Sequence, residues 1–123
     1  DLESLEVKPQ LQLSRSSESL LAMRWIAMLH NKVDLTLAAT GGIHNAEDVM
    51  RLLLAGADVT HMCAALLMNS PEYLGSVLQQ MQEWMEENEY ESVGQLKGSV
   101  SQQHASDPAA YERANYIEVL RSM

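Results

Sequence analysis

Apolar and polar residues follow one another along this chain in a pattern that predicts two strand–loop–helix units. Residues 35–39 are mostly apolar and predict a buried strand, whereas residues 46–54 have helical spacing and lead to a glycine that closes the helix. A second strand is expected over 58–62, and Ser70 is expected to cap the next long helix. Successive strand–helix units predict parallel strands that are covered on both faces.

The residues before the first strand predict an arm and a helix. Residues 5–13 alternate in polarity around a proline, so we expect an extended edge segment or a small hairpin there. Residues 18–30 have helical spacing, and Ser16 or Ser17 is expected to cap this helix. Its buried face is expected to consist of Leu21, Trp25, Met28 and Leu29.

The residues after the second strand predict further helices. The long helix that follows Ser70 is expected to bury Leu74, Val77, Leu78, Met81 and Met85. We expect Ser92 to cap a short helical turn, residues 99–106 to form a polar loop, and Asp107 to start a last helix. Its candidate contacts are Tyr111, Ala114, Ile117 and Leu120.

Two parallel strands cannot complete a sheet alone, because their outer edges need partner strands. Their spacing along the chain is near the repeat length of a (β/α)8 barrel. The sequence therefore predicts an α/β fold that is the C-terminal portion of a (β/α)8 TIM barrel, about strands 7 and 8 with their helices, plus an extra C-terminal helix. Residues 1–17 are expected to form an arm and a loop, residues 18–98 the closing βα units, and residues 99–123 a loop and the last helix.

Small residues follow both predicted strands. Gly41 and Gly42 lie between the first strand and its helix, which Asn45 is expected to cap, and this geometry aims free backbone N–H groups at an anion. Cys63 and Ala64 follow the second strand, so that two neighbouring loops predict a phosphate site. The alternative is that the glycines only permit a tight turn with unusual backbone angles.

The side chains beside this site are expected to have structural roles. We expect Cys63 to be a small buried residue and not a nucleophile. His61 lies inside the second strand and is expected to be a core or barrel-lumen histidine. Trp25 and Trp84 are expected to pack helices against the barrel. No spacing of histidines predicts a metal site.

The net charge of the chain disfavours some classes of binding partner. The 123 residues include 8 basic and 17 acidic side chains, for a net charge of −9, which argues against nucleic acid or an anionic membrane as a partner. The single cysteine excludes an internal disulfide and favours a cytoplasmic protein. No apolar run approaches a membrane span. Because the chain begins at Asp1, we expect a processed protein or a part of a longer one.

Several runs of this chain, taken together, resemble the C-terminal part of the dihydroorotate dehydrogenases. The resemblance covers roughly residues 14–98, and the helix expected after Asp107 is similar to the bacterial dihydroorotate dehydrogenase-like branch. The runs that carry it are MRWI (23–26), LAATGGI (37–43), AED (46–48), LAGADV (54–59) and YESVGQLKG (90–98).

That resemblance implies an FMN-dependent (β/α)8 barrel that oxidises dihydroorotate to orotate or acts on a related substrate. It implies that the FMN phosphate rests on the loops after strands 7 and 8, with one further contact after strand 6. The family typically has Gly-Thr where this chain has Cys63-Ala64, so a hydroxyl donor is missing. The implied contacts are Thr40, Gly41, Gly42, Cys63, Ala64 and Ser14.

The resemblance also implies that the catalytic base lies upstream of this segment. No catalytic residue is assigned here, and we expect the chain alone to be inactive and the complete protein to form a homodimer. Two alternatives remain open at this point. One is another FMN-binding or phosphate-binding TIM barrel, and the other is a non-catalytic half-barrel that self-associates through its strand edges.

Overall fold

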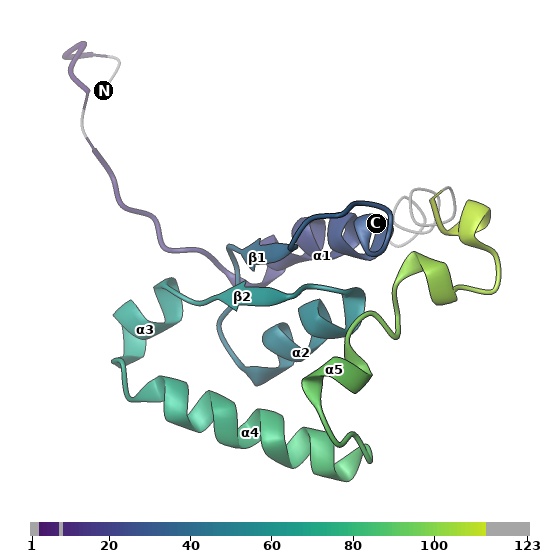
Figure 1. The fold of residues 1–123 in the computed structure, drawn as a ribbon. Coiled ribbons are helices and arrows are strands. Elements are labelled where there is room, and N and C mark those ends of the chain that lie inside the picture. Colours follow the sequence, from purple (N-terminus) through teal and green to yellow (C-terminus); the bar gives the residue numbers. More distant parts are fainter. Residues whose placement is uncertain (1–2, 8, 113–123) are drawn as a thin grey trace.

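A pair of short parallel strands connected by a helix lies at the centre of the fold (Figure 1). The computed structural model describes residues 3–7 and 9–112. The mixed α/β order agrees with the predicted succession of strand and helix. In chain order the elements are η1 (Ser16–Glu18), α1 (Ser19–Leu29), β1 (Ala38–Thr40), α2 (Ala46–Ala55), β2 (Val59–His61), α3 (Ala64–Asn69), α4 (Tyr73–Glu87), α5 (Val93–Leu96) and η2 (Gln102–His104).

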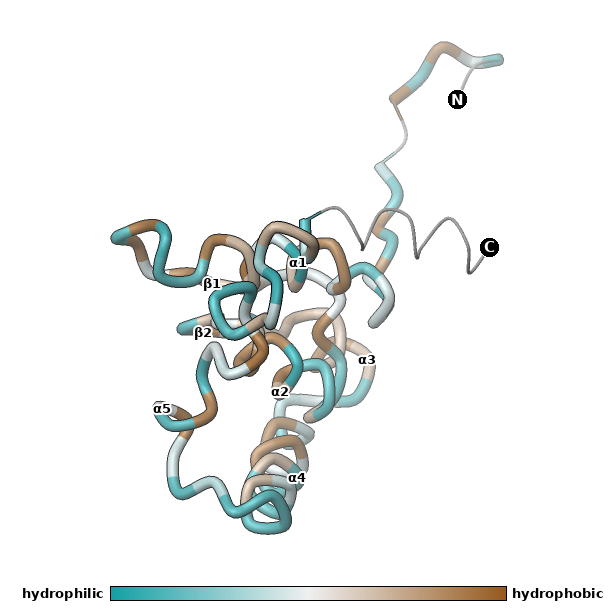
Figure 2. The backbone as a smooth tube through the Cα atoms, turned by 90° about the vertical axis from the view of Figure 1, so that its right-hand side faces the viewer, coloured by the Kyte–Doolittle hydropathy of each residue, from teal (hydrophilic) through white to brown (hydrophobic). Residues whose placement is uncertain are grey.

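Helices cover only one face of the strands. β1 contacts α1 and β2 contacts α2, and the side view in Figure 2 places both helices on the same side of the strands. Ala39 is buried beneath these helices, whereas its neighbours Ala38 and Thr40 are exposed on the other face. The predicted burial of both faces is therefore wrong for the described residues, which contain no element that covers the second face.

The first strand is also shifted from its predicted position. β1 begins at Ala38, and Leu35, the expected first residue of the strand, is exposed. The pairing with β2 sets this limit, because Ala38 lies opposite Val59 and Thr40 lies opposite His61. Residues that lie opposite no residue of β2 cannot extend the hydrogen-bonded pair of strands.

The central helix α2 follows its prediction closely. The side chain of Asn45 accepts a hydrogen bond from the backbone N–H of Asp48 at 2.9 Å, which confirms the N-cap. Gly56 ends the helix with a positive φ of 121°, and its N–H donates to the carbonyl of Leu52. Val49, Leu52 and Leu53 make α2 the middle of the core, between the strands, α1 and α4.

The buried face of α1 differs from the predicted one. Ile26 and Ala27 are buried, whereas Leu21 and Trp25 are 66% and 55% exposed. The predicted serine cap is also wrong, because η1 precedes α1 and Glu18 occupies the N-cap position without a side-chain bond. In the predicted apolar stripe, Leu21 and Trp25 therefore face away from the core of the described residues, whereas Met28 is half-buried.

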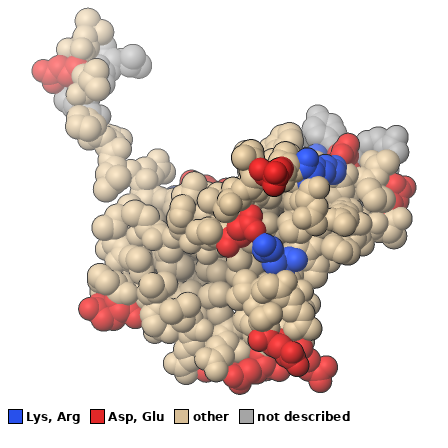
Figure 3. Space-filling model, viewed as in Figure 1, with Lys and Arg blue, Asp and Glu red and all other residues tan. Residues whose placement is uncertain are grey.

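The region after β2 contains a helix that the sequence pattern did not predict, α3. Ser70 ends α3 with a φ of 140° and does not cap the long helix, whose N-cap position belongs to Glu72. Of the predicted stripe on α4, Val77 is buried, whereas Leu74 and Leu78 are exposed. At the other end of α4, Glu83, Glu86 and Glu87 are exposed and form the acidic group at that end of the helix in Figure 3.

The segment after α5 returns to α2 and donates hydrogen bonds to the carbonyl groups of its last turn. The N–H of Gly98 donates to Leu53 at 3.0 Å, and the N–H of Val100 donates to Leu54 at 3.0 Å. Ser92 caps α5, as predicted. The predicted polar loop that follows contains η2, and Gln102 within it is buried and donates to the carbonyl of Pro108.

The described residues near the two ends of the chain differ in how they meet this body. Asp107 caps the last helical turns by accepting from Ala109 and Ala110, as predicted, and Tyr111 packs against the core. The expected contacts Ala114, Ile117 and Leu120 lie outside the described residues. The N-terminal arm runs away from the body (Figure 2), and its described residues form no strand or hairpin, with Leu5, Val7 and Leu11 exposed.

Within residues 3–7 and 9–112, no helix has both the length and the apolar character that crossing a membrane requires.

Candidate phosphate-binding site

The loops that follow the two strands enclose one cavity of about 220 Å³. Part of its wall comes from the segment before η1, part from the loop after β1, and part from the end of β2 and the start of α3. The structure thus brings together all six residues that the sequence and the family resemblance point to. These residues are Ser14, Thr40, Gly41, Gly42, Cys63 and Ala64.

The two glycines of the first loop serve different purposes. Both have positive φ, 85° at Gly41 and 70° at Gly42, which favours glycine at each position. A Cβ atom on Gly42 would lie 2.4 Å from the backbone nitrogen of Ser19 and 2.7 Å from the carbonyl oxygen of Arg15, so packing excludes any side chain. A Cβ atom on Gly41 would meet nothing within 4 Å. Gly42 therefore holds the loop against η1, and Gly41 borders open space.

Backbone N–H groups at the start of α2 are already used by nearby side chains. His44 donates its N–H to the Asp48 carboxylate at 3.0 Å, and Asp48 donates its own N–H to Asn45. Within residues 9–112, the N–H groups of Gly42 and Ile43 meet no acceptor. The N–H groups of Ala46 and Glu47 in the first turn of α2 also meet no acceptor in this range, but these two residues do not line the cavity. The free donors that border the cavity therefore belong to the glycine loop.

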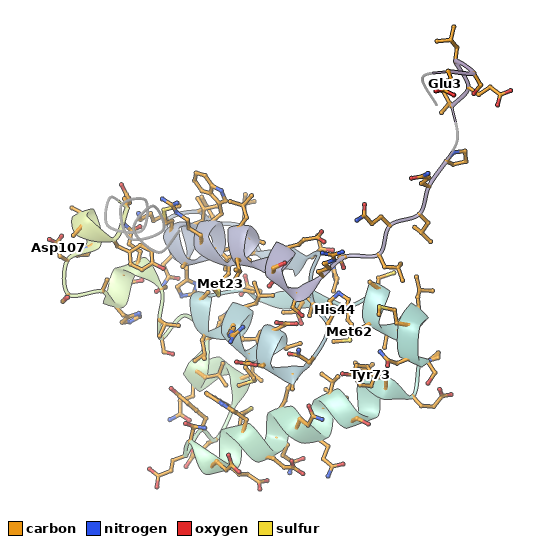
Figure 4. All side chains as sticks on the ribbon, turned by 180° about the vertical axis from the view of Figure 1, so that it is seen from behind. Glu3, Met23, His44, Met62, Tyr73 and Asp107 are labelled. Atoms are coloured by element: carbon orange, nitrogen blue, oxygen red, sulfur yellow. The ribbon has the colours of Figure 1, made fainter. Side chains whose placement is uncertain are left out.

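Two side-chain contacts fasten the glycine loop to the segment before α1. The Ser14 hydroxyl lies 3.2 Å from Nε2 of His44, and the Ser16 hydroxyl donates to the Asp48 carboxylate at 2.8 Å. Figure 4 shows His44 where the N-terminal segment meets the loop between β1 and α2. Ser14 lines the cavity, whereas Ser16 and Asp48 lie behind its wall.

The second loop presents a thiol where a buried residue was expected. Cys63 is exposed and lines the cavity, so the expectation that it is buried is wrong. The reason is its position after β2, where the chain turns into α3 and the exposed face of the strands continues into the cavity. Ala64 beside it supplies no hydroxyl group, so this loop can contribute backbone groups and the Cys63 thiol.

The wall of the cavity contains no carboxylate although the protein is strongly acidic. Aspartate, glutamate, lysine and arginine are absent from its lining residues, and its ionisable side chains are those of His61 and Cys63. An anion in this cavity would meet no carboxylate on the wall, and hydrogen-bond donors would carry its recognition.

His61, which was expected to be a core or barrel-lumen histidine, lines the cavity. The register places it opposite Thr40 on the exposed face of the strands, and both residues line the cavity. Strand alternation supplied the signal, because residues at i and i+2 share a face and His61 lies two residues before Cys63. His44 lies behind the wall instead, in contact with Ser14.

The opposite end of the strands is tied together by side chains. The ring of His30 packs between Gly56 and Gly98, so that a Cβ atom on either glycine would lie 2.5 Å or less from the ring. Asp58 accepts hydrogen bonds from Lys97 at 2.6 Å and from the N–H of Leu37 at 2.8 Å. These bonds, above all that from Lys97, hold the pKa of the Asp58 carboxyl below its ordinary value.

Relatives of known identity match most of this chain. It is 32% identical over 80 residues to the dihydroorotate dehydrogenase B (NAD(+)) catalytic subunit of Lachnoclostridium phytofermentans, a match that covers 65% of this chain and 26% of the relative. It is 30% identical over 86 residues to the corresponding subunit of Shouchella clausii, covering 70% of this chain and 28% of that protein. No protein-family model matches the chain.

The alignments therefore involve little more than a quarter of the length of each relative. Both relatives carry the same name and both are oxidoreductases. The similarity supports a relationship between this chain and the dihydroorotate dehydrogenases.

Proposed function

We propose that this chain is the phosphate-anchoring part of an FMN-dependent oxidoreductase related to dihydroorotate dehydrogenase. One observation carries the proposal: the six residues singled out in the sequence line one cavity, without a carboxylate on its wall, at the C-terminal ends of two parallel strands. Ligands of parallel α/β folds bind at this end of the strands. The relationship to dihydroorotate dehydrogenases favours FMN over other phosphate-bearing ligands.

The residues present fit a phosphate monoester. Gly41 borders open space, and the N–H groups of Gly42 and Ile43 are unused among residues 9–112. The hydroxyl groups of Ser14 and Thr40 add neutral donors to the same cavity. A volume of about 220 Å³ is below the usual size of a site that encloses a whole drug-sized ligand, and it suits the phosphate end of a larger cofactor.

FMN, when bound, would supply hydride transfer with the substrate. In this proposal the chain's own residues bind and orient the phosphate, and they hold no proton for the reaction. We assign no catalytic residue to this chain, and we expect it to be inactive without the residues that supply the base.

Exposed apolar surface on both flanks of the sheet supports a place within a barrel. Among the described residues the sheet has two strands, so each strand has an unpaired edge. Beside β1, α1 exposes Leu21 and Trp25. Beside β2, an apolar groove of about 420 Å³ is bordered by Met62, Leu74 and Leu78. Further βα units on both sides would cover these surfaces, as the closing quarter of a (β/α)8 barrel requires.

The test uses the full-length polypeptide that carries this sequence. It measures how strongly a bound ligand protects the Cys63 thiol from alkylation. Its thiol is exposed and lies on the cavity wall, so a phosphate ligand should slow its alkylation by iodoacetamide. Peptide mass spectrometry would give the alkylation rate of Cys63 with FMN, with riboflavin, which lacks the phosphate, with inorganic phosphate, and with no ligand. An absorption spectrum after gel filtration would report retained flavin.

We expect FMN to protect Cys63 and riboflavin to protect it much less. Equal protection by inorganic phosphate and by FMN would assign the cavity to another phosphate ligand. A protein that retains no flavin and shows no protection of Cys63 by FMN would overturn the proposal.

A further inference from the structure

Asp48 is a buried carboxylate beside the cavity, and within residues 9–112 its carboxylate accepts hydrogen bonds from neutral donors and forms no ion pair. It is 3% exposed and lies in the first turn of α2. Burying a carboxylate is costly unless hydrogen bonds or opposite charge compensate for the lost water. Two donors reach the same oxygen, Oδ2, from different parts of the chain: the Ser16 hydroxyl at 2.8 Å and the His44 N–H at 3.0 Å.

These two bonds join two walls of the cavity. His44 directly follows Gly42 and Ile43, and Ser16 lies two residues after Ser14, all three of which line the cavity. Ser14 and His44 also meet directly at 3.2 Å. Asp48 lies outside the cavity lining, so it would act on a ligand only through the residues that it holds.

We propose that Asp48 is the positioning residue of the phosphate site, fixing the glycine loop against the segment of Ser14 and Ser16. This inference rests on the proposed function. Hydrogen bonds to a charged acceptor are stronger than neutral ones. The dipole of α2 also favours a carboxylate in its first turn. A loop held in this way presents its free N–H groups without rearrangement when a phosphate arrives.

Charge alone would give Asp48 the opposite effect on binding. A carboxylate near a phosphate repels it, so neutralising Asp48 should tighten FMN binding if only Coulombic interaction mattered. If Asp48 acts by holding the glycine loop in place, removal of its acceptor oxygen weakens FMN binding although the repulsion also disappears. The sign of the change therefore separates the two roles.

The experiment compares four variants of the full-length polypeptide by titration with FMN and with riboflavin. Asp48→Ala removes the acceptor, whereas Asp48→Asn removes the charge and keeps an oxygen that can accept both bonds. Glu47→Ala is the matched control, because it removes an exposed carboxylate from the same turn of α2, where it pairs with Arg51. Ser16→Ala removes one donor and keeps the experiment decisive if Asp48→Ala does not fold.

We expect Asp48→Ala to raise the Kd for FMN by about tenfold or more and Ser16→Ala by about threefold. Asp48→Asn and Glu47→Ala should stay within about twofold of the unaltered protein, and riboflavin binding should change little in all four. Hydrogen exchange should also accelerate at the His44 N–H in Asp48→Ala but not in Glu47→Ala.

Unchanged or tighter FMN binding by folded Asp48→Ala and Ser16→Ala would overturn the inference while leaving the proposed function intact. Failure of the unaltered protein to bind FMN would overturn the proposed function and the binding role of Asp48 with it. In that case hydrogen exchange at His44 would still decide whether Asp48 fixes the loop.

Discussion

The two ends of the strand pair use glycine in opposite ways. At the C-terminal end, Gly41 has a positive φ and borders an open cavity. At the N-terminal end, Gly56 and Gly98 also have positive φ, but the ring of His30 fills the space that a side chain would need. A glycine with positive φ is thus not by itself a sign of a binding site. The atoms around its missing Cβ decide whether the position serves packing or a ligand.

The two ends also differ in charge. The cavity at the C-terminal end has no acidic or basic side chain other than His61 and Cys63 on its wall. The other end joins Asp58 and Lys97 in an ion pair whose side chains are 30% and 35% exposed. In parallel α/β barrels the C-terminal end of the strands carries function and the other end carries stability. The following substitutions test whether the two ends of this strand pair are divided in the same way.

Gly98→Ala should have the largest effect, and it should act on stability. The new Cβ atom would lie 2.2 Å from Nε2 of His30 at a φ of 76°, so overpacking and backbone strain both oppose it. We expect the free energy of unfolding to fall by about 3 kcal/mol in urea denaturation. Gly75→Ala is the control, because Gly75 lies in α4 with open space around it and the change should be neutral or stabilising. A loss below about 1 kcal/mol for Gly98→Ala would mean that His30 can move aside.

Gly41→Ala should instead act mainly on binding. Its Cβ atom would meet no protein atom, so we expect only the strain of a left-handed alanine, about 1 kcal/mol of unfolding free energy. The added methyl group would crowd an anion beside the loop, and the Kd for FMN should rise by about tenfold. Titration with FMN beside urea denaturation measures both quantities. Equal losses of stability in Gly41→Ala and Gly98→Ala would contradict the division between the two ends.

Asp58→Asn should have a smaller effect that depends on pH. The pKa of Asp58 is lowered in the folded chain, so the bonds from Lys97 and Leu37 contribute stability above the unfolded pKa of about 3.9. That contribution is lost as the pH falls through the folded pKa. Because solvent screens the pair, we expect Asp58→Asn to cost about 0.5–1 kcal/mol at pH 7.

Thermal unfolding at several pH values would check this expectation. The stability curves of Asp58→Asn and the unaltered protein should converge as the pH falls below about 4. FMN affinity at pH 7 should be the same in both proteins. A difference in stability that persists at pH 2 would assign the effect to packing and not to the charge of Asp58.

His61→Ala should have the smallest effect on stability. The side chain is exposed at the cavity, so the free energy of unfolding should change by no more than about 0.5 kcal/mol. Its hydrogen-bonding ring faces the site that we propose for the phosphate, so FMN binding should weaken by a few-fold while stability is kept. A loss of stability similar to that of Gly98→Ala would place His61 in the packing of the fold.

The sequence predicted the parts of the fold that local chemistry determines. As expected, α2 begins after Asn45 and ends at Gly56, because an N-cap side chain and a left-handed glycine act on their nearest neighbours along the chain. The same holds for Ser92 and Asp107. The paired glycines also identified residues that lie together in one cavity, since parallel strands bring their following loops side by side.

The sequence could not predict features that depend on distant segments. Helical spacing identified the stripe of Leu21 and Trp25 on α1, but spacing does not say which neighbour a stripe faces. The bond from Ser16 to Asp48 joins residues 32 positions apart, and no local pattern indicates it. Cysteine is a residue type that is usually buried, and only the direction of the chain after β2 exposes Cys63.

The bonds from Gly98 and Val100 to the last turn of α2 have a consequence for how this chain folds. The carbonyl groups of Leu53 and Leu54 acquire these partners only when a segment far along the chain returns to them. Closing such a loop costs chain entropy before the contact repays it. The end of α2 should therefore fray until residues 98–100 dock, and the two segments should open and close as one cooperative unit.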